Sequence, residues 1–182
     1  MIQVSFYAVA LAMAALWLTL RIVAYVRTGE ISIRKEFHIF LLFLYVLMIV
    51  RGVIFPMRSY DGGPVSVYVE LPTMYPPRIN IMPFTFITDY YPGWQVNVFG
   101  NIILFIPVGF LFPLVFRRIN TFAKAVVFGL GFTCTIEFVQ LFLRDRCTDV
   151  DDLILNTLGA AIGALVFFEI RKRKVSGYCS LR

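Results

Sequence analysis

The chain contains 182 residues, of which 59% are hydrophobic and 15% are charged, with a mean hydropathy of +0.79. A soluble domain contains about 45–50% apolar and about 25% charged residues, so this composition excludes an ordinary soluble domain. The net charge of +6 does not indicate a nucleic-acid partner, because Lys and Arg lie in short clusters between apolar segments. We therefore predict an all-α membrane protein, a bundle of about five transmembrane helices whose partners are membrane lipids and not nucleic acid.

The first predicted span covers roughly residues 2–26 and begins with nineteen uncharged residues, which is enough to cross about 30 Å of hydrocarbon. Its first positive charge, Arg21, follows the apolar run, which is typical of an uncleaved anchor with its N-terminus outside. The second span is expected over residues 37–55. Residues 1–55 therefore form a predicted N-terminal segment of two transmembrane helices.

The next segment, residues 56–93, cannot span the membrane because seven of the nine prolines lie there. We predict a Pro-rich extracytoplasmic loop with a turn at residues 61–64, where the sequence is Asp-Gly-Gly-Pro. Apolar and polar residues alternate over residues 65–71, which indicates a short strand. The aromatic segment 82–91 is expected to lie along the membrane interface.

Three further apolar segments predict spans at about residues 94–116, 121–143 and 152–170. Acidic residues at the start of the last span suit a helix N-terminus and its dipole; they are Asp149, Asp151 and Asp152. A basic run follows this span, so residues 171–182 are predicted to be a cytoplasmic tail.

The distribution of Lys and Arg predicts the orientation. With the N-terminus outside and the C-terminus in the cytoplasm, the inside segments hold eleven positive residues and the outside segments hold four. The reverse orientation would invert this ratio and break the positive-inside rule. Two arginines within spans, Arg21 and Arg51, are in neither count.

Polar residues that are unusual in membrane spans converge, in this topology, on the outer side. They are Asn97 and Asn101 in the third span, Glu137 and Gln140 in the fourth, Arg146 in the following loop, and Asp149, Asp152 and Asn156 around the start of the fifth. An ionised group at the bilayer centre costs about 2.5–3.5 kcal/mol on insertion scales, so it normally faces a partner or a cavity. The pattern predicts an outward-facing polar site.

Such a site can perform acid–base chemistry, bind a divalent cation or hold a phosphate. The candidate catalytic residues are Glu137, as acid or base, with Asp149 and Asp152, which could also be cation ligands. The candidate substrate-binding residues are Asn97, Asn101, Gln140, Arg146, as an anion contact, and Asn156. The alternative is structural, because Asn and Gln side chains also hydrogen-bond helices to one another in membranes.

The sequence predicts no dedicated metal site and identifies no cofactor. His38 is the single histidine and lies at the predicted cytoplasmic edge, and the three cysteines fit no metal spacing. Gly159 and Gly163 form a small-xxx-small pair that predicts close helix packing.

Two ordered runs of residues carry a family resemblance over about residues 80–168. The first run is Asn80-Ile-Met-Pro-Phe84 followed by Asn97-x-x-Gly-Asn101-x-x-x-Phe-x-Pro107-x-Gly109-x-x-x-Pro113. The second is Glu137-x-x-Gln140, then Arg146-x-x-Asp149-x-x-Asp152-x-x-x-Asn156-x-x-Gly159-x-x-x-Gly163. Together they resemble the signature of the VanZ-like family, and residues 80–168 are read as a VanZ-like domain with three transmembrane helices.

The resemblance implies a multi-pass protein of the bacterial cell membrane. The family is named for an accessory protein that lowers susceptibility to teicoplanin, a glycopeptide antibiotic. A role in the cell envelope and in antibiotic resistance is therefore implied, with a lipid-linked cell-wall precursor or a glycopeptide as the expected partner. The resemblance carries over no established catalytic residue and no oligomeric state.

Three functions fit these observations. The first is an enzyme or lipid-modifying protein acting on an envelope lipid or cell-wall precursor. The second is a non-catalytic binder that shields an envelope target or sequesters an antibiotic. The third is a small transporter or flippase subunit, which is the weakest fit because few polar residues lie in the inner halves of the three C-terminal spans.

Overall fold

The structure is a computed structural model that describes residues 2–29, 31–56, 63–70, 78–88, 93–144 and 146–179. The chain divides into two compact units. The first unit comprises Met1–Arg78 and Val139–Cys147, and the second comprises Ile79–Phe138 and Thr148–Arg182.

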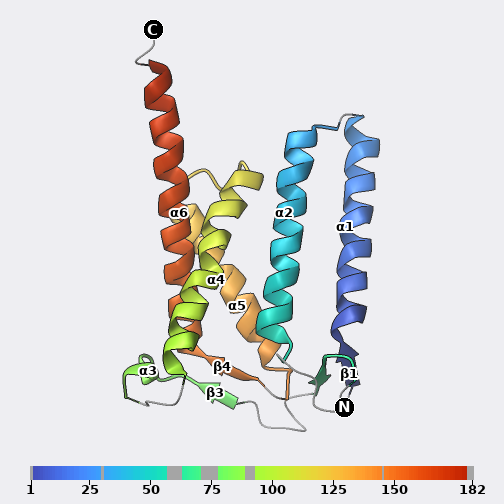
Figure 1. The fold of residues 1–182 in the computed structure, drawn as a ribbon, viewed down its shortest axis with the longest axis vertical. Helices are drawn as coiled ribbons and strands as arrows, with labels where there is room; N and C mark the ends of the chain where they lie inside the picture. The colour runs from blue at the N-terminus through green and yellow to red at the C-terminus, as the bar shows by residue number, and fades with distance from the viewer. Residues whose placement is uncertain are drawn as a thin grey trace. The chain divides into compact units, whose positions relative to one another are not determined.

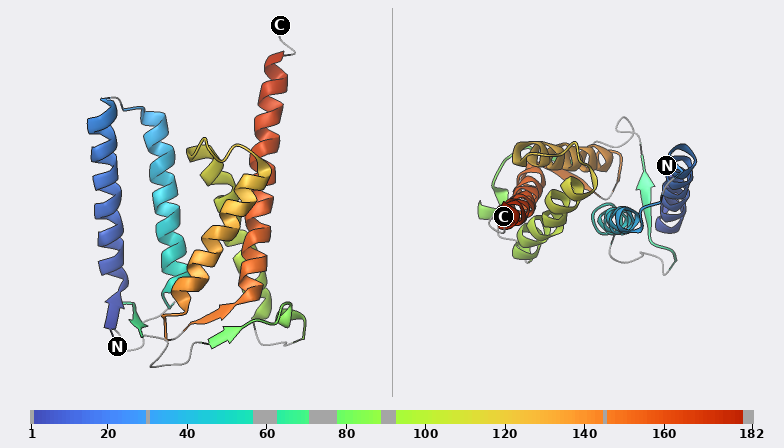
Figure 2. Two further views of the ribbon diagram at one scale, coloured as in Figure 1. Left: turned by 180° about the vertical axis from the view of Figure 1, so that it is seen from behind. Right: turned by 90° about the horizontal axis from the view of Figure 1, so that it is seen from above.

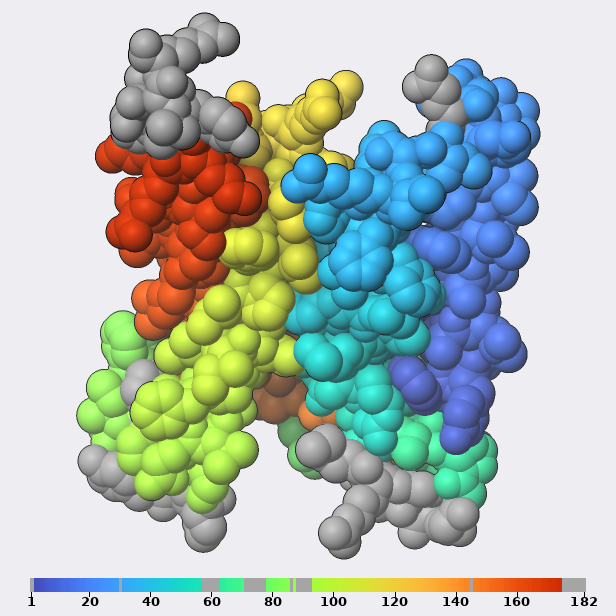
Figure 3. Space-filling view, turned by 45° about the horizontal axis from the view of Figure 1, so that its top comes forward, coloured from blue at the N-terminus to red at the C-terminus, as the bar shows by residue number. Residues whose placement is uncertain are grey.

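The first unit contains two antiparallel helices of membrane length, drawn in blue and cyan in Figure 1. Helix α1 (Phe6–Thr28) begins after Ser5, whose side chain caps it, and ends at Gly29 in the left-handed conformation that glycine tolerates. Helix α2 (Ile33–Ile49) continues directly into a π-helix, η1 (Val50–Ile54). The space-filling view in Figure 3 shows the side chains of α1 and α2 against one another along the hairpin.

A small sheet ties the start of the chain to the segment that follows α2. Strand β1 (Ile2–Ser5) pairs antiparallel with β2 (Ser66–Val69), and Val69 also forms a bridge with Leu143. The first span was predicted to begin at residue 2, which was wrong, because residues 2–5 find backbone partners in β2 and form a strand. The predicted strand at 65–71 is confirmed over Ser66–Val69, and residue 71 lies outside the described residues, as do residues 61 and 62 of the predicted turn.

The second unit is built on three long helices with short elements at one end. It contains α4 (Trp94–Val115), α6 (Val150–Cys179) and most of α5 (Phe122–Gln140), together with α3 (Thr85–Thr88) and most of the strands β3 (Arg78–Asn80) and β4 (Cys147–Asp149). Strands β3 and β4 pair with each other. Figure 2 shows from behind that α3, β3 and β4 lie at the end where α4 and α6 begin.

Glycines allow α4 and α6 to approach closely. A Cβ atom added to Gly163 would collide with the carbonyl oxygen of Ile106, and one added to Gly109 would collide with the carbonyl oxygen of Ala160. At the same interface Phe105 and Ala160 are completely buried. The small-xxx-small pair predicted from the sequence thus packs directly against the backbone of α4.

All five predicted spans are confirmed as helices long and apolar enough to cross a membrane. The fourth ends at Gln140 instead of residue 143, because Phe142 and Arg144 hydrogen-bond through their backbones to Glu70 and Tyr68. The fifth continues to Cys179, since the basic residues after the span are good helix formers. Of the segment predicted to lie along the interface, residues 85–88 form α3, and residues 89–91 lie outside the described residues.

Candidate functional site

The predicted polar residues of the second unit gather where α4 and α6 begin and where α5 ends, beside the short elements (Figure 1). This end of the unit collects side chains from α4, α5 and α6 and from the segments of β3 and α3.

Asp149 is the N-cap of α6. Its Oδ1 accepts a hydrogen bond of 2.8 Å from the backbone N–H of Asp151, two residues into the helix. Its carboxylate also accepts from Nδ2 of Asn80, at 3.2 and 3.1 Å to the two oxygens. The side chain predicted to be catalytic therefore also fixes the start of α6 and the position of β3.

Asp151 was not predicted as a site residue, yet its side chain is 4% exposed. It accepts hydrogen bonds from the backbone N–H groups of Phe84 and Thr85, at 2.5 and 2.9 Å, and from the Thr85 hydroxyl at 2.7 Å. Phe84 has a φ of 64°, a strained conformation for a residue with a bulky side chain. Asp151 holds this turn and the start of α3 in place.

Glu137 lies within the apolar α5 helix and is 4% exposed. Its Oε2 accepts a hydrogen bond of 3.0 Å from the backbone N–H of Asp149, and its own carbonyl oxygen accepts one of 3.1 Å from the Thr148 hydroxyl. The Glu137 carboxylate is thus fixed against the N-cap of α6. Sequence spacing alone could not show this contact, because it joins two helices through a backbone amide.

The remaining predicted residues of the second unit differ in their surroundings. Asn101 donates a hydrogen bond from Nδ2 to Oδ1 of Asp152. Asn156 is 2% exposed and donates from Nδ2 to the Thr133 hydroxyl at 2.9 Å, which links α6 to α5. Asn97 is exposed, and within the described part of the chain no side-chain hydrogen bond joins it to this cluster.

The cluster therefore contains four carboxylates, on Glu137, Asp149, Asp151 and Asp152. The hydrogen-bond donors just named are amides, hydroxyls and backbone N–H groups, all of them neutral. Each of these donors orients a carboxylate oxygen by hydrogen bonding and carries no formal charge of its own. Within the described ranges, no group of three His, Cys, Asp or Glu side chains is arranged to hold a metal ion.

The other two predicted residues, Gln140 and Arg146, belong to the first unit and contact the end of η1. Arg146 donates from Nε to the carbonyl oxygen of Ile54 at 3.2 Å and from an Nη to that of Phe55 at 2.7 Å. Gln140 donates from Nε2 to the carbonyl oxygen of Val53 at 3.3 Å. A helix end leaves its last carbonyl groups without intrahelical donors, and these side chains supply donors to them.

A shallow hollow in the first unit brings these residues beside further charges. It is lined by Glu70, Arg78, Gln140, Arg144 and Arg146, among others. An Nη of Arg144 lies 3.8 Å from a carboxylate oxygen of Glu70. The predicted anion contact, Arg146, therefore lies at this hollow with two further arginines of the described residues, Arg78 and Arg144.

Sequence reasoning missed Asp151, Asn80 and Thr85 as members of the cluster. Asn80 was one of the ordered residues of the family signature, and Asp151 stood between two predicted acids, so both carried a signal. Thr85 carried none, because its role depends on the turn that brings its N–H group and hydroxyl to Asp151.

A family model described as VanZ/LLP1 matches residues 37–171, which is more than half of the chain. The curated protein "Protein VanZ" from Enterococcus faecium is 28% identical to this chain over 127 residues, which cover 70% of this chain and 71% of that protein. No solved structure matches the chain.

Proposed function

Because this chain belongs to the VanZ/LLP1 family of resistance-associated multi-pass membrane proteins, we propose that it acts at the outer face of the bacterial cell membrane on an envelope lipid or a lipid-linked cell-wall precursor. In this proposal the N-terminus is outside and the C-terminus is cytoplasmic, as the eleven-to-four distribution of positive residues favours. The effect on the cell would be lower susceptibility to a glycopeptide such as teicoplanin.

One observation carries the proposal: Glu137, a carboxylate in an apolar helix, is buried and accepts a hydrogen bond from a neutral donor, the Asp149 N–H group. An ionisable group inside a span is costly to bury, so it normally faces a partner or a cavity and marks a functional site. Asp149, Asp151 and Asp152 surround the start of α6 with further negative charge. This arrangement supports Glu137 as the acid or base, with Asp152 and Asn101 next to the substrate.

The second candidate is a binder that performs no reaction. It is supported by the structural tasks of Asp149 and Asp151, whose oxygens already hold a helix cap and a turn. A binding site needs shape and hydrogen bonds but no proton transfer, so it would tolerate an amide in place of the Glu137 carboxylate.

Teicoplanin susceptibility in a sensitive Gram-positive host distinguishes these functions. The host would express wild type, Glu137→Gln, Asp152→Asn or the control Glu169→Gln, with membrane levels checked by immunoblot. Glu169 is an exposed carboxylate near the other end of α6, so its replacement removes the same charge away from the cluster.

Loss of protection in Glu137→Gln and Asp152→Asn, with normal levels and an active control, supports chemistry at the cluster. Full protection by Glu137→Gln favours the binder. If wild type itself leaves teicoplanin susceptibility unchanged, the proposed resistance function is wrong for this chain.

The proposed orientation has its own test, which does not depend on activity. Single cysteines replace Gly63 or Arg118, both at exposed positions, in a chain whose natural cysteines are changed to serine. A membrane-impermeant maleimide should label the Gly63→Cys variant in intact cells and the Arg118→Cys variant only after permeabilisation. The opposite result would reverse the orientation.

A further inference from the structure

The hairpin of α1 and α2 contains a hollow that the proposed function does not use. It has a volume of about 390 Å³ and lies beside the connection between the two helices. Its polar lining comes from Arg21, Tyr25, Thr28, Ser32, Lys35 and Glu36. All of these residues precede the region matched by the family model, which begins at residue 37.

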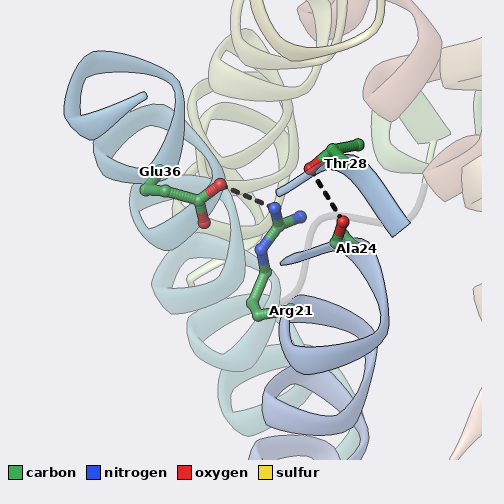
Figure 4. Close-up of polar contacts among 4 residues, drawn as sticks. All are labelled: Arg21, Ala24, Thr28 and Glu36. Carbon is green, nitrogen blue, oxygen red and sulfur yellow. Dashed lines mark hydrogen bonds and ion pairs between the residues drawn. The ribbon is translucent and has the colours of Figure 1, made fainter. Parts of the chain in front are cut away.

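We propose that this hollow binds the phosphate of an anionic phospholipid headgroup, with Arg21 as the principal contact and Lys35 as the second. Figure 4 shows the Arg21 side chain directed to Glu36, between the two helices. An Nη of Arg21 lies 2.6 Å from a carboxylate oxygen of Glu36, so part of the guanidinium already has an anionic partner.

The Nε atom of the Arg21 guanidinium indicates a ligand. Nε of Arg21 is buried and has no hydrogen-bond partner among the described residues. A buried donor without an acceptor is unfavourable, and arginine presents its donors in a fork that matches a phosphate. Arg21 lines the hollow, so a small rotation of its side chain would bring this N–H group to an acceptor bound there.

The charge and the local backbone favour an anion. Among the described residues that line the hollow, two carry a positive charge, Arg21 and Lys35, and Glu36 carries a negative one. Helix α2 begins here, and its N-cap residue Ser32 makes no side-chain capping hydrogen bond. The exposed N–H groups at a helix start and the positive end of its dipole attract phosphate groups.

The surroundings favour a lipid as the source of that phosphate. Helix α1 has no buried residue, and apolar side chains near Arg21 are exposed, including Leu20, Ile22 and Val26 at 57%, 54% and 76%. The hollow lies at the end of two membrane-length helices, which is the depth of the headgroups. A headgroup can therefore enter the hollow while its acyl chains lie along α1.

The natural probe of this site is Trp17, four residues before Arg21 and on the same side of α1. The chain has two tryptophans, so Trp94→Phe leaves Trp17 as the sole tryptophan, which can be excited selectively over the tyrosines. The full chain would be reconstituted in phosphatidylcholine vesicles containing either brominated phosphatidylglycerol or brominated phosphatidylcholine. Quenching of Trp17 by the brominated chains then reports the relative affinity for the two headgroups.

We expect a preference for phosphatidylglycerol of about fivefold or more, because one basic residue near an anionic surface contributes about 1 kcal/mol. Arg21→Gln and Lys35→Gln should each reduce this preference severalfold. Arg34→Gln is the matched control, since Arg34 is exposed beside Lys35 but does not line the hollow. It should retain most of the preference.

Three results would overturn the proposal. The first is equal quenching by both brominated lipids in wild type. The second is an equal loss of the lipid preference in Arg34→Gln and Lys35→Gln, which would show that the protein attracts the lipid through its general positive charge and not through a specific site. The third is protection of Trp17 from brominated phosphatidylglycerol by millimolar inorganic phosphate, which would identify free phosphate as the ligand. Lys35 is exposed, so its replacement gives a result even if Arg21→Gln does not fold.

Discussion

Close packing of α4 and α6 predicts that Gly163→Ala destabilises the second unit. A Cβ atom at this position would collide with the carbonyl oxygen of Ile106 and come within 3.2 Å of the backbone nitrogen of Phe110. The collision is with backbone atoms, which cannot rotate away, so the two helices must move apart. Other side chains of this interface, such as Phe105, would then lose contacts along its length.

The magnitude follows from two opposing effects. Inserting a methyl group into a tightly packed interior costs about 1–3 kcal/mol, and a backbone contact places this case near the upper limit. Alanine is a better helix former than glycine by about 1 kcal/mol, which offsets part of the cost. We expect a net loss of about 2 kcal/mol in the free energy of unfolding.

The measurement is equilibrium unfolding in micelles with rising dodecyl sulfate, followed by far-ultraviolet circular dichroism. The matched control is Gly131→Ala on α5, where an added Cβ atom meets nothing within 4 Å. This variant should be as stable as wild type or more stable. If Gly163→Ala proves as stable as Gly131→Ala, the close approach of α4 and α6 inferred here is incorrect.

Three other contacts can be tested in the same way. Asp149→Ala should lower the free energy of unfolding by about 1 kcal/mol because the α6 cap is lost, and Asp149→Ser should restore most of it. Equal stability of wild type and both variants would refute the capping role. A double-mutant cycle of Thr133→Val and Asn156→Leu should give a coupling energy of about 0.6 kcal/mol, with an upper limit of about 1.7 kcal/mol. Strictly additive effects would show that their hydrogen bond does not contribute to stability. Arg146→Leu should raise the rate of amide hydrogen exchange in η1 about tenfold, because two hydrogen bonds to carbonyl groups are lost. A tenfold rise corresponds to about 1.4 kcal/mol. An unchanged exchange rate would contradict the role of Arg146 at that helix end.

The five spans could be predicted from the sequence because hydrophobic length is a property of each segment alone. Strand β1 could not, since the apolar residues 2–5 read equally well as the start of a span. Only their pairing with residues 66–69, more than sixty positions later, decides between the two conformations.

The polar cluster was predicted only in part, because only some of its residues can be recognised without knowing their partners. Glu137, Asp152 and Asn101 are rare residue types for a span, so each could be identified by itself. The partners of Asp151 are backbone N–H groups of residues 84 and 85, which every sequence contains and which no residue pattern marks. For Gln140 and Arg146, the sequence identified the donors but not the carbonyl acceptors of η1.

The first unit has a consequence for the order of events during synthesis, because its two pieces are separated by sixty residues of the second unit. Strand β2 has its backbone partners in residues 2–5 and in residues 142–144. The carbonyl groups at the end of η1 likewise gain their donors, Gln140 and Arg146, only after these later residues have been synthesised. At about 5–20 residues per second, the ribosome needs several seconds between β2 and these later residues. During that interval the hairpin of α1 and α2 resides in the membrane with an unpaired strand edge, which is the period when a chaperone or a protease would recognise the nascent chain.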